Sequence, residues 1–314
     1  MKSKSIMTKR GMVMYDPAIP MTVRLNREET QKLCPFNVDP DKWDCLDDHC
    51  EVVHIEITSK CDKACLYCYN PKNEKDLSTE ELVKLIDNLA KADVFQITFG
   101  GGEPFTREDI AYLASHAKSV GLNVCATTNG KILNSMCVFQ PVATQDLLKS
   151  FGQINVSYHG SEFEFSDILN IAAVCKKVGV KMGINFCCQD DYMEKLDWVA
   201  GIAHDIDAEL LMLAYKPVNP SLGIKGPSGP EIVKKAFEMA SKYKIDTGVD
   251  GACVRQCLAS VRFCDVHPNG DVSVCSFKRE SIGNALTQDF GEIWASRPKE
   301  IQCPHFPDVR NNPR

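Results

Sequence analysis

The chain has 314 residues, of which 44% are hydrophobic and 25% charged, and its formal net charge is −6 at pH 7. These values are ordinary for globular proteins and exclude a disordered or fibrous chain, while the length suggests one large domain or two average ones. The acidic balance gives no basic footprint for nucleic acid, and no apolar run reaches the length of a membrane span. The basic N-terminal stretch is broken by Asp16 and Pro17 without a cleavage pattern. We therefore expect a cytoplasmic protein that binds neither nucleic acid nor membrane.

Sixteen cysteines are the unusual feature of the composition. In a small secreted domain such a number predicts a disulfide framework, but this chain is long and shows no export signal. Metal ligation is therefore the better general explanation, although isolated cysteines are also ordinary small core residues. We interpret Cys125, Cys137 and Cys175 in that second way.

The first fifty residues form a predicted leader segment without a clear repeat. It contains Cys34, Cys45 and Cys50, which together with His49 offer side chains for a metal site. Their spacing matches no metal-binding pattern, so surface or core thiols are the preferred interpretation.

From residue 52 to about 215, short β-branched runs alternate with amphipathic helical stretches. The pattern predicts six strands, at 52–57, 94–99, 123–127, 153–157, 181–186 and 209–214. It predicts helices at 78–92, 106–120, 164–178, 193–206 and, after a Pro/Gly-rich connector, 231–244. Parallel strands need crossover helices, and six strands are too few for a closed eight-stranded barrel. The predicted fold class is therefore α/β, a partial (β/α)6 barrel with parallel strands and its chemistry at the carboxyl ends of those strands.

The segment after the first predicted strand holds Cys61, Cys65 and Cys68 in a C-x3-C-x2-C spacing. Three thiolates this close together, on a loop at the carboxyl end of a strand, can bind one face of a cubane iron–sulfur cluster. The missing fourth ligand leaves one iron open, as catalytic metal sites commonly keep one position open. A zinc knuckle would need a fourth ligand, and His54 lies inside the strand, where it is poorly placed for that role. We predict a [4Fe-4S] cluster on the three cysteines.

The cysteine spacing, with the aromatic Tyr67 before the last cysteine, resembles the radical S-adenosylmethionine (SAM) superfamily. The second predicted strand ends in Gly101-Gly102-Glu103-Pro104, which resembles the Gly-Gly-Glu-Pro motif of that family. Glycines let backbone groups approach a ligand closely, and a glutamate can pair with an ammonium group. One motif alone is weak evidence, but the two lie on neighbouring strands of the same predicted rim.

Five further positions resemble cofactor-contacting residues of the superfamily. Thr128 and Asn129 end the third strand in a Thr-Asn-Gly group, and Ser157 ends the fourth. Asn185 and Leu213, on the fifth and sixth strands, are expected to line the same cofactor wall. The resemblance thus covers residues 52 to about 215 in order.

This resemblance implies a reaction and its cofactors. SAM would chelate the open iron through its amine and carboxylate, and an electron from the cluster would cleave its C–S bond. The products would be methionine and a 5′-deoxyadenosyl radical that takes hydrogen from the substrate. A reducing partner such as flavodoxin or ferredoxin would supply the electron, and the protein would supply positioning and exclusion of water.

Three residues on the predicted rim are candidates for catalytic side chains. His159 follows the fourth strand, at a place where many members of the superfamily carry an aspartate. It is either a substrate-facing acid or base or a structural histidine. Cys187 and Cys188 end the fifth strand, and one of them could donate a hydrogen atom to a substrate radical. Ordinary core thiols are the alternative interpretation of this pair.

The last part of the chain, residues 250–314, changes character and holds five cysteines. A Pro-Asn-Gly-Asp turn at 268–271, between two alternating stretches, predicts a β-hairpin with Cys264 and Cys275 on adjacent strands. The predicted fold thus ends in a small cysteine-rich C-terminal extension built on this hairpin.

The spacing from Cys257 through Gly270 to Cys275 resembles the opening of the SPASM and twitch extensions of radical SAM enzymes. The segments 281–284 and 293–294 also resemble the part that follows in them. A full SPASM domain would continue with a further cysteine-rich run, whereas only Cys303 follows here. The resemblance therefore favours one auxiliary iron–sulfur cluster, expected to be of the [4Fe-4S] type. A zinc site made by the same residues is the other interpretation. The preferred ligands are Cys257, Cys264, Cys275 and Cys303, with Cys253 as the alternative.

These patterns divide the chain into a leader (1–50), a radical SAM partial barrel with its following helix (51–249) and an auxiliary-cluster domain (250–314). The preferred function is radical SAM modification of a ribosomal peptide or a protein side chain. Radical oxidation or rearrangement of a small metabolite is the alternative. A non-catalytic iron–sulfur or zinc-binding protein is the rival from another class, and it explains the cysteines but not the segment 101–104.

Overall fold

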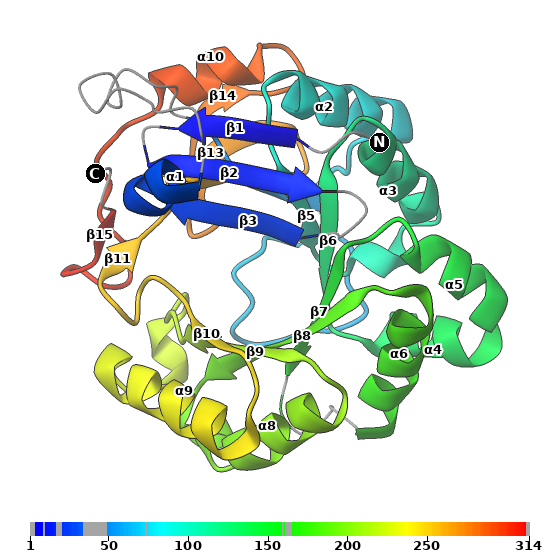
Figure 1. Ribbon diagram of the computed structural model, residues 1–314, viewed down its shortest axis with the longest axis vertical. Coiled ribbons are helices and arrows are strands. Elements are labelled where there is room, and N and C mark those ends of the chain that lie inside the picture. The colour runs from blue at the N-terminus through cyan, green and yellow to red at the C-terminus, as the bar shows by residue number, and fades with distance from the viewer. Residues whose placement is uncertain are drawn as a thin grey trace.

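A ten-stranded sheet dominates the computed structural model, which describes residues 4–8, 10–16, 21–33, 49–72, 74–158, 160 and 165–311. The strands follow one another in the order β10-β9-β8-β7-β6-β5-β4-β12-β13-β14. Helices from α2 to α9 surround the curved sheet, and a separate three-stranded sheet lies across one end of it (Figure 1).

The six predicted strands form the centre of this sheet, and their parallel arrangement is confirmed. Their side chains alternate between two faces. In β5, for example, Ile97 and Phe99 are fully buried in the main core, while Gln96 and Thr98 point to the other, inner face. The strands are β4 (Val52–Thr58), β5 (Gln96–Gly101), β6 (Asn123–Thr128), β7 (Gln153–Tyr158), β8 (Lys181–Cys188) and β9 (Glu209–Ala214).

The predicted helices are present with modified ends. Ser78 caps α2 through the expected reciprocal hydrogen bonds with Glu81. The helix expected from residue 106 begins only at Ile110, because the chain first forms a short 3-10 turn at Pro104–Thr106. The helices of this layer are α2 (Thr79–Lys91), α3 (Ile110–Ser119), α4 (Lys131–Phe139), α5 (Pro141–Leu148), α6 (Phe165–Val178), α7 (Asp190–Met193), α8 (Leu196–Asp205) and α9 (Gly229–Tyr243).

The C-terminal extension continues the barrel sheet. Strand β12 (Phe263–Val266) pairs in parallel with β4, and the turn at residues 268–271 leads into β13 (Asp271–Cys275), which confirms the predicted hairpin. Strand β14 (Lys278–Asn284) adds to β13, and α10 (Phe290–Ser296) follows. At the other edge β10 (Thr247–Val249) pairs with β9. A separate ladder joins β11 (Gln256–Cys257) to β15 (Arg310–Asn311). The predicted boundary near residue 250 therefore falls within one continuous sheet.

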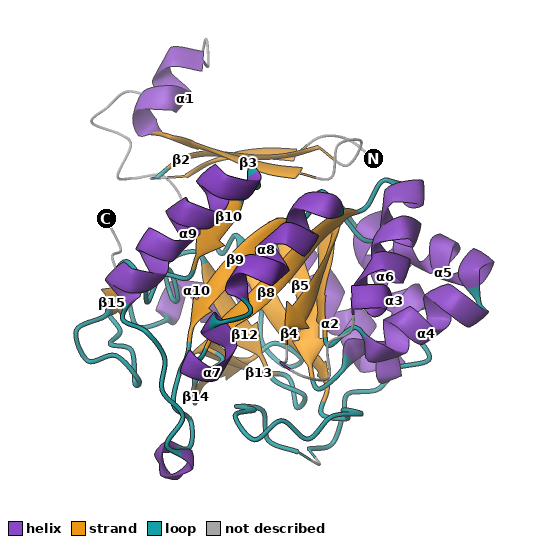
Figure 2. Cartoon of the chain, turned by 90° about the horizontal axis from the view of Figure 1, so that it is seen from below, coloured by secondary structure: helices purple, strands orange, loops and turns teal. Residues whose placement is uncertain are grey.

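The leader segment forms an antiparallel sheet of β1 (Lys4–Thr8), β2 (Gly11–Asp16) and β3 (Met21–Asn26), followed by α1 (Arg27–Leu33). Figure 2 shows it at the end of the barrel opposite the long loops. Val13 packs against Phe95 just before β5, and Arg24 pairs with the buried Glu51 just before β4. The small sheet thus covers the amino ends of the barrel strands.

A search of the described part of the chain for a helix long and apolar enough to cross a membrane finds none.

Candidate active site

The predicted cluster ligands lie together on the loop that follows β4. Cys61 and Cys68 are exposed and Cys65 is half-buried. Their three sulfur atoms do not all lie within 4.8 Å of one another, as the ligands of a single zinc ion would. In a cubane each thiolate binds a different iron, so a wider spacing suits such a cluster. The donor set on this loop therefore fits an iron–sulfur cluster with one open position.

The segment 101–104 packs directly on the start of this loop. The backbone N–H of Gly102 donates to the carbonyl of Thr58 (2.7 Å), and that of Glu103 donates to the carbonyl of Lys60 (2.7 Å). A Cβ atom at Gly102 would lie only 2.0 Å from the Lys60 oxygen, so only glycine allows this approach. The two motifs that the sequence placed on one rim are therefore in contact.

Glu103 is buried at the centre of this rim, with 1% of its surface exposed. Its carboxylate accepts hydrogen bonds from the Thr128 hydroxyl (2.7 Å), the backbone N–H of Asn129 (2.8 Å) and that of Phe105 (3.2 Å). Burial raises the pKa of Glu103 to about 7, against the opposing effect of these donors. The carboxylate is thus fixed in place and would gain strongly from a cationic partner.

The structure gives the predicted Thr-Asn-Gly group a positioning role. Thr128 and Asn129 both donate to Glu103, and the side-chain amide of Asn129 also donates to Asp62 on the cysteine loop (2.7 Å). The end of β6 thereby holds the glutamate and the cluster loop in one arrangement. Asp62 had no signal in the sequence beyond its place between two cluster cysteines.

Four of the candidate residues share the inner face of the sheet by strand register. Ser157 lies beside Asn185, and Cys187 lies beside Leu213. The side-chain oxygen of Asn185 and the hydroxyl of Tyr215, which directly follows β9, are buried, and neither has a hydrogen-bond partner among the described residues. Buried polar atoms rarely stay unpaired, so these atoms suit contact with a polar ligand such as SAM.

The two adjacent cysteines of β8 face opposite ways. Cys188 is fully buried in the main core, as one-residue alternation requires. Cys187 lies on the inner face. It is close enough to Tyr67 and Tyr192 to contribute to their raised pKa values, and Lys216 opposes the burial that raises the pKa of Cys187 itself. The rings of Tyr67 and Tyr192 meet edge to face with centroids 6.4 Å apart. Cys187 therefore lies near the cluster loop. The third candidate for a catalytic side chain, His159, lies outside the described residues.

The structure brings three of the four preferred auxiliary ligands together. Cys257 and Cys275 pack against the same small apolar cluster, and Cys303 lies near enough to raise the pKa of Cys257, together with burial. Burial and the nearby Cys257 also raise the pKa of Cys275 to about 11. With such raised pKa values, these cysteines are protonated thiols unless a metal binds them as thiolates.

The fourth preferred ligand, Cys264, lies elsewhere. The next residue along β12, Asp265, lies opposite Ser273 on the inner face, so strand alternation turns Cys264 to the other face. There its sulfur is fully buried, 3.8 Å from the sulfur of Cys50. Cys50 is thus a core thiol, as the sequence indicated, while Cys34 and Cys45 lie outside the described residues.

Cys253, the alternative ligand, lies beside an ion pair that the sequence analysis missed. Lys216 Nζ lies 2.5 Å from Asp250, and the thiol of Cys253 donates to the same carboxylate (3.2 Å). Burial would lower the pKa of Lys216, but Asp250 raises it, and Cys187 and Cys275 add to this effect. Lys216 therefore stays charged between the inner face and the auxiliary cysteines. Its place directly after the sixth strand was the available signal.

Two family models match the chain. That of the radical SAM superfamily matches residues 55–185, and that of the SPASM iron–sulfur cluster-binding domain matches residues 257–311. The first range contains the cysteine loop and Glu103, and the second contains Cys257, Cys275 and Cys303. The two domains imply SAM, the cluster on the loop after β4 and an auxiliary iron–sulfur cluster.

Curated relatives include both peptide and tetrapyrrole enzymes. The PqqA peptide cyclase of Bradyrhizobium diazoefficiens is 27% identical over 182 residues, which are 52% of this chain and 45% of that protein. The chain thus spans about half the length of the peptide cyclases that it matches. The AdoMet-dependent heme synthase of Methanosarcina barkeri is 24% identical over 280 residues, which are 76% of this chain and 80% of that protein.

Solved structures share the fold. Streptococcus suis SuiB bound to its precursor peptide SuiA has a TM-score of 0.71 at 13% identity, covering 95% of this chain and 88% of that one. Native anSMEcpe with bound AdoMet and a peptide has a TM-score of 0.58 at 15% identity, covering 79% of this chain and 80% of that one. The two family-model matches, together with the cysteine loop and the buried Glu103, show that the chain contains a radical SAM domain followed by a C-terminal iron–sulfur cluster-binding domain of the SPASM type.

Proposed function

We propose that the protein is an enzyme that reductively cleaves SAM and abstracts a hydrogen atom from a peptide substrate. One observation carries the proposal: the inner face connects the cluster loop to the auxiliary cysteines. Cys187 lies near Tyr67 of the cluster loop, and Lys216 lies near both Cys187 and Cys275. When bound, SAM and its cluster supply the 5′-deoxyadenosyl radical, while the residues of the chain position the reactants and exclude water.

Glu103 is the group proposed to bind the ammonium of SAM, with Ser157, Asn185 and Leu213 forming the wall beside it. Replacing Glu103 with Gln removes the charge, and charged hydrogen bonds contribute about 1.5–3 kcal/mol. We therefore expect SAM affinity to fall about 10- to 100-fold. Equilibrium binding to the reconstituted enzyme measures this change.

The Glu103 carboxylate should also make SAM affinity depend on pH. Its pKa of about 7 means that the ionised form becomes dominant only above neutral pH. SAM affinity should therefore rise between about pH 6 and 8 in the wild type, and the Glu103→Gln variant should lack this rise. An unchanged affinity and pH profile in the variant would exclude Glu103 as the ammonium site.

The auxiliary cluster is proposed to bind Cys257, Cys275 and Cys303, with Cys253 in place of Cys264 as the fourth ligand. Cys253→Ala should lower the iron content of the auxiliary site substantially, because a closed cubane needs four protein ligands. Cys264→Ala is the matched control, since that thiol lies in the core with Cys50. It should keep full iron content and only lose some stability. Iron loss in the Cys264 variant alone would restore the assignment made from the sequence.

Cys187, rather than Cys188, is the thiol proposed to donate hydrogen to a substrate radical. Cys187→Ala should lower product yield about tenfold or more while SAM cleavage continues, since only a step after hydrogen abstraction is affected. Cys188→Ala should keep product formation and lose stability, because it removes a buried core atom. Equal product yield from the two variants would rule out this role.

The peptide substrate is proposed from the relatives, since PqqA peptide cyclase and the SuiA-bound SuiB carry peptides in their names. The longer match to a heme synthase supports a small-molecule substrate as the second candidate. Small precursor peptides encoded beside the gene, and an iron porphyrin precursor, are the two probes. The enzyme is incubated anaerobically with SAM and dithionite. A peptide whose mass changes in step with 5′-deoxyadenosine formation supports the proposal, and turnover of the porphyrin alone selects the second candidate.

A flavodoxin or ferredoxin is proposed as the physiological reducing partner, and a cytoplasmic location stays a prediction from the sequence. Replacement of dithionite by reduced flavodoxin tests the partner. Sustained 5′-deoxyadenosine formation is the expected result.

A further inference from the structure

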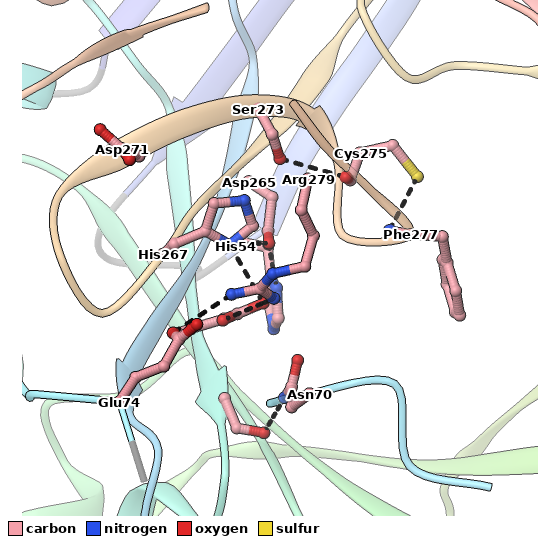
Figure 3. Close-up of polar contacts among 12 residues, drawn as sticks. His54, Asn70, Glu74, Asp265, His267, Asp271, Ser273, Cys275, Phe277 and Arg279 are labelled. Atoms are coloured by element: carbon pink, nitrogen blue, oxygen red, sulfur yellow. Dashed lines mark hydrogen bonds and ion pairs between the residues drawn. The ribbon is translucent and has the colours of Figure 1, made fainter. Parts of the chain in front are cut away.

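A buried group of polar side chains lies where the extension joins the barrel, and it contains no cysteine. Glu56 comes from β4, Asp265 from β12, and His267 directly follows β12. The parallel pairing of β4 with β12 sets Asp265 beside His54, one pleat from Glu56. Figure 3 shows Asp265 and His267 close together, beside His54 and Arg279. We call Glu56, Asp265 and His267 the junction triad.

The junction triad has the dimensions of a metal site. One ligand atom from each residue lies within 4.8 Å of the other two. His267 Nδ1 is 3.4 Å from Glu56 Oε1 and 3.4 Å from Asp265 Oδ2. These separations are too long for good hydrogen bonds, yet short enough for three atoms to surround one ion.

Several atoms of the triad lack partners although they are buried. The exposed fractions are 2% for Glu56, 0% for Asp265 and 4% for His267. Asp265 Oδ2 and both ring nitrogens of His267 have no hydrogen-bond partner among the residues that the structure describes. Each such buried, unpaired group costs about 1–3 kcal/mol, so a bound species that pairs with these atoms would stabilise the protein.

The surrounding charges leave a negative excess. Glu56, Asp265 and the partly exposed Glu74 face a single guanidinium, that of Arg279, which contacts Glu56 (2.8 Å) and Glu74 (3.3 Å). His54 lies 2.5 Å from Asp265 and balances a second charge when protonated. With His267 neutral, as an imidazole that binds a metal ion must be, one carboxylate then stays unbalanced, and two stay so when His54 is also neutral. A positive ion inside the triad removes this excess.

We propose that the junction triad binds one divalent cation of the Mn²⁺, Fe²⁺ or Zn²⁺ type. Two carboxylates and one imidazole are a donor set that these ions accept, whereas Mg²⁺ and Ca²⁺ favour oxygen alone. His54 and Arg279 act as the outer residues that hold the two carboxylates in position. The ion joins β4, which leads to the cluster loop, to β12, which leads to the hairpin of Cys275.

Binding of Mn²⁺ tests this proposal. It is measured as the decrease in the EPR signal of the free ion. The protein is the fully reconstituted enzyme, treated with a mild chelator and kept with both clusters in their oxidised, EPR-silent state. We expect one Mn²⁺ per chain and a melting temperature raised by a few degrees. His267→Ala should weaken this binding about 100-fold or more and abolish the thermal shift.

The control is His116→Ala, because His116 pairs with Asp87 at the surface of α3, away from the triad. It should bind Mn²⁺ like the wild type. Asp265→Asn is the second test, in case His267→Ala does not fold, and it should lose binding while keeping its size. Absence of Mn²⁺ and Zn²⁺ binding in the wild type would overturn the proposal, as would binding that survives in both triad variants.

Discussion

Replacing Cys65 with Ala is expected to reduce SAM cleavage to background while the protein stays folded. Two thiolates cannot hold a cubane that also keeps one iron open for SAM. The loop with Cys65 lies outside the barrel core, and the thiol is only half-buried. The measurement is 5′-deoxyadenosine by chromatography after anaerobic incubation with dithionite and SAM, together with the melting temperature.

The matched control for this result is Cys137→Ala. That thiol is 6% exposed, lies in α4 and packs in the main core. We expect normal cleavage and a stability loss of about 1 kcal/mol, as for removal of a small buried group. Wild-type production of 5′-deoxyadenosine by the Cys65 variant would refute the radical assignment.

Replacing Cys275 with Ala is expected to separate the two clusters by role. The wild type should contain about eight irons per chain, as two four-iron clusters, and the variant about four. A cluster closed by four protein ligands has no open iron for SAM. Slow, substrate-independent SAM cleavage should therefore persist, while product formation falls to near zero. The hairpin also loses its metal anchor, so lower solubility is expected.

Paired assays of 5′-deoxyadenosine and product on folded Cys275→Ala protein check this division. The Cys264→Ala variant serves as the comparison, because its thiol lies on the same hairpin but packs in the core beside Cys50. Normal product yield in the Cys275 variant would show that the auxiliary cluster is dispensable. A wild-type content of about four irons plus one zinc would show that the auxiliary site is a structural zinc site and not an iron–sulfur cluster.

The six barrel strands could be predicted because each depends on local pattern. Segments such as 153–157 combine β-branched residues with two-residue alternation, and each end of the observed strands lies within two residues of the predicted one. The capping box at Ser78 could likewise be predicted, because it depends on only four consecutive residues. Local signals of this kind do not depend on the rest of the chain.

The features that were missed depend on pairing between distant segments. Nothing in residues 263–266 indicates that they pair with residues 52–55, and this pairing decides which way Cys264 and Asp265 point. The hairpin signal correctly placed Cys264 and Cys275 on adjacent strands but could not show that they face opposite sides. The small β1–β3 sheet was also missed, because its short strands are stabilised by contact with Phe95 and Glu51.

The parallel pairing of β12 with β4 also orders the events of synthesis. Strand β4 leaves the ribosome well before its partner at 263–266, which follows more than 200 residues later. Until then one edge of β4 has unpaired backbone groups, the kind of edge that recruits other chains. Closure of so long a loop is also slow. A nascent chain of this protein therefore exposes this edge of β4 until residues 263–266 have been synthesised.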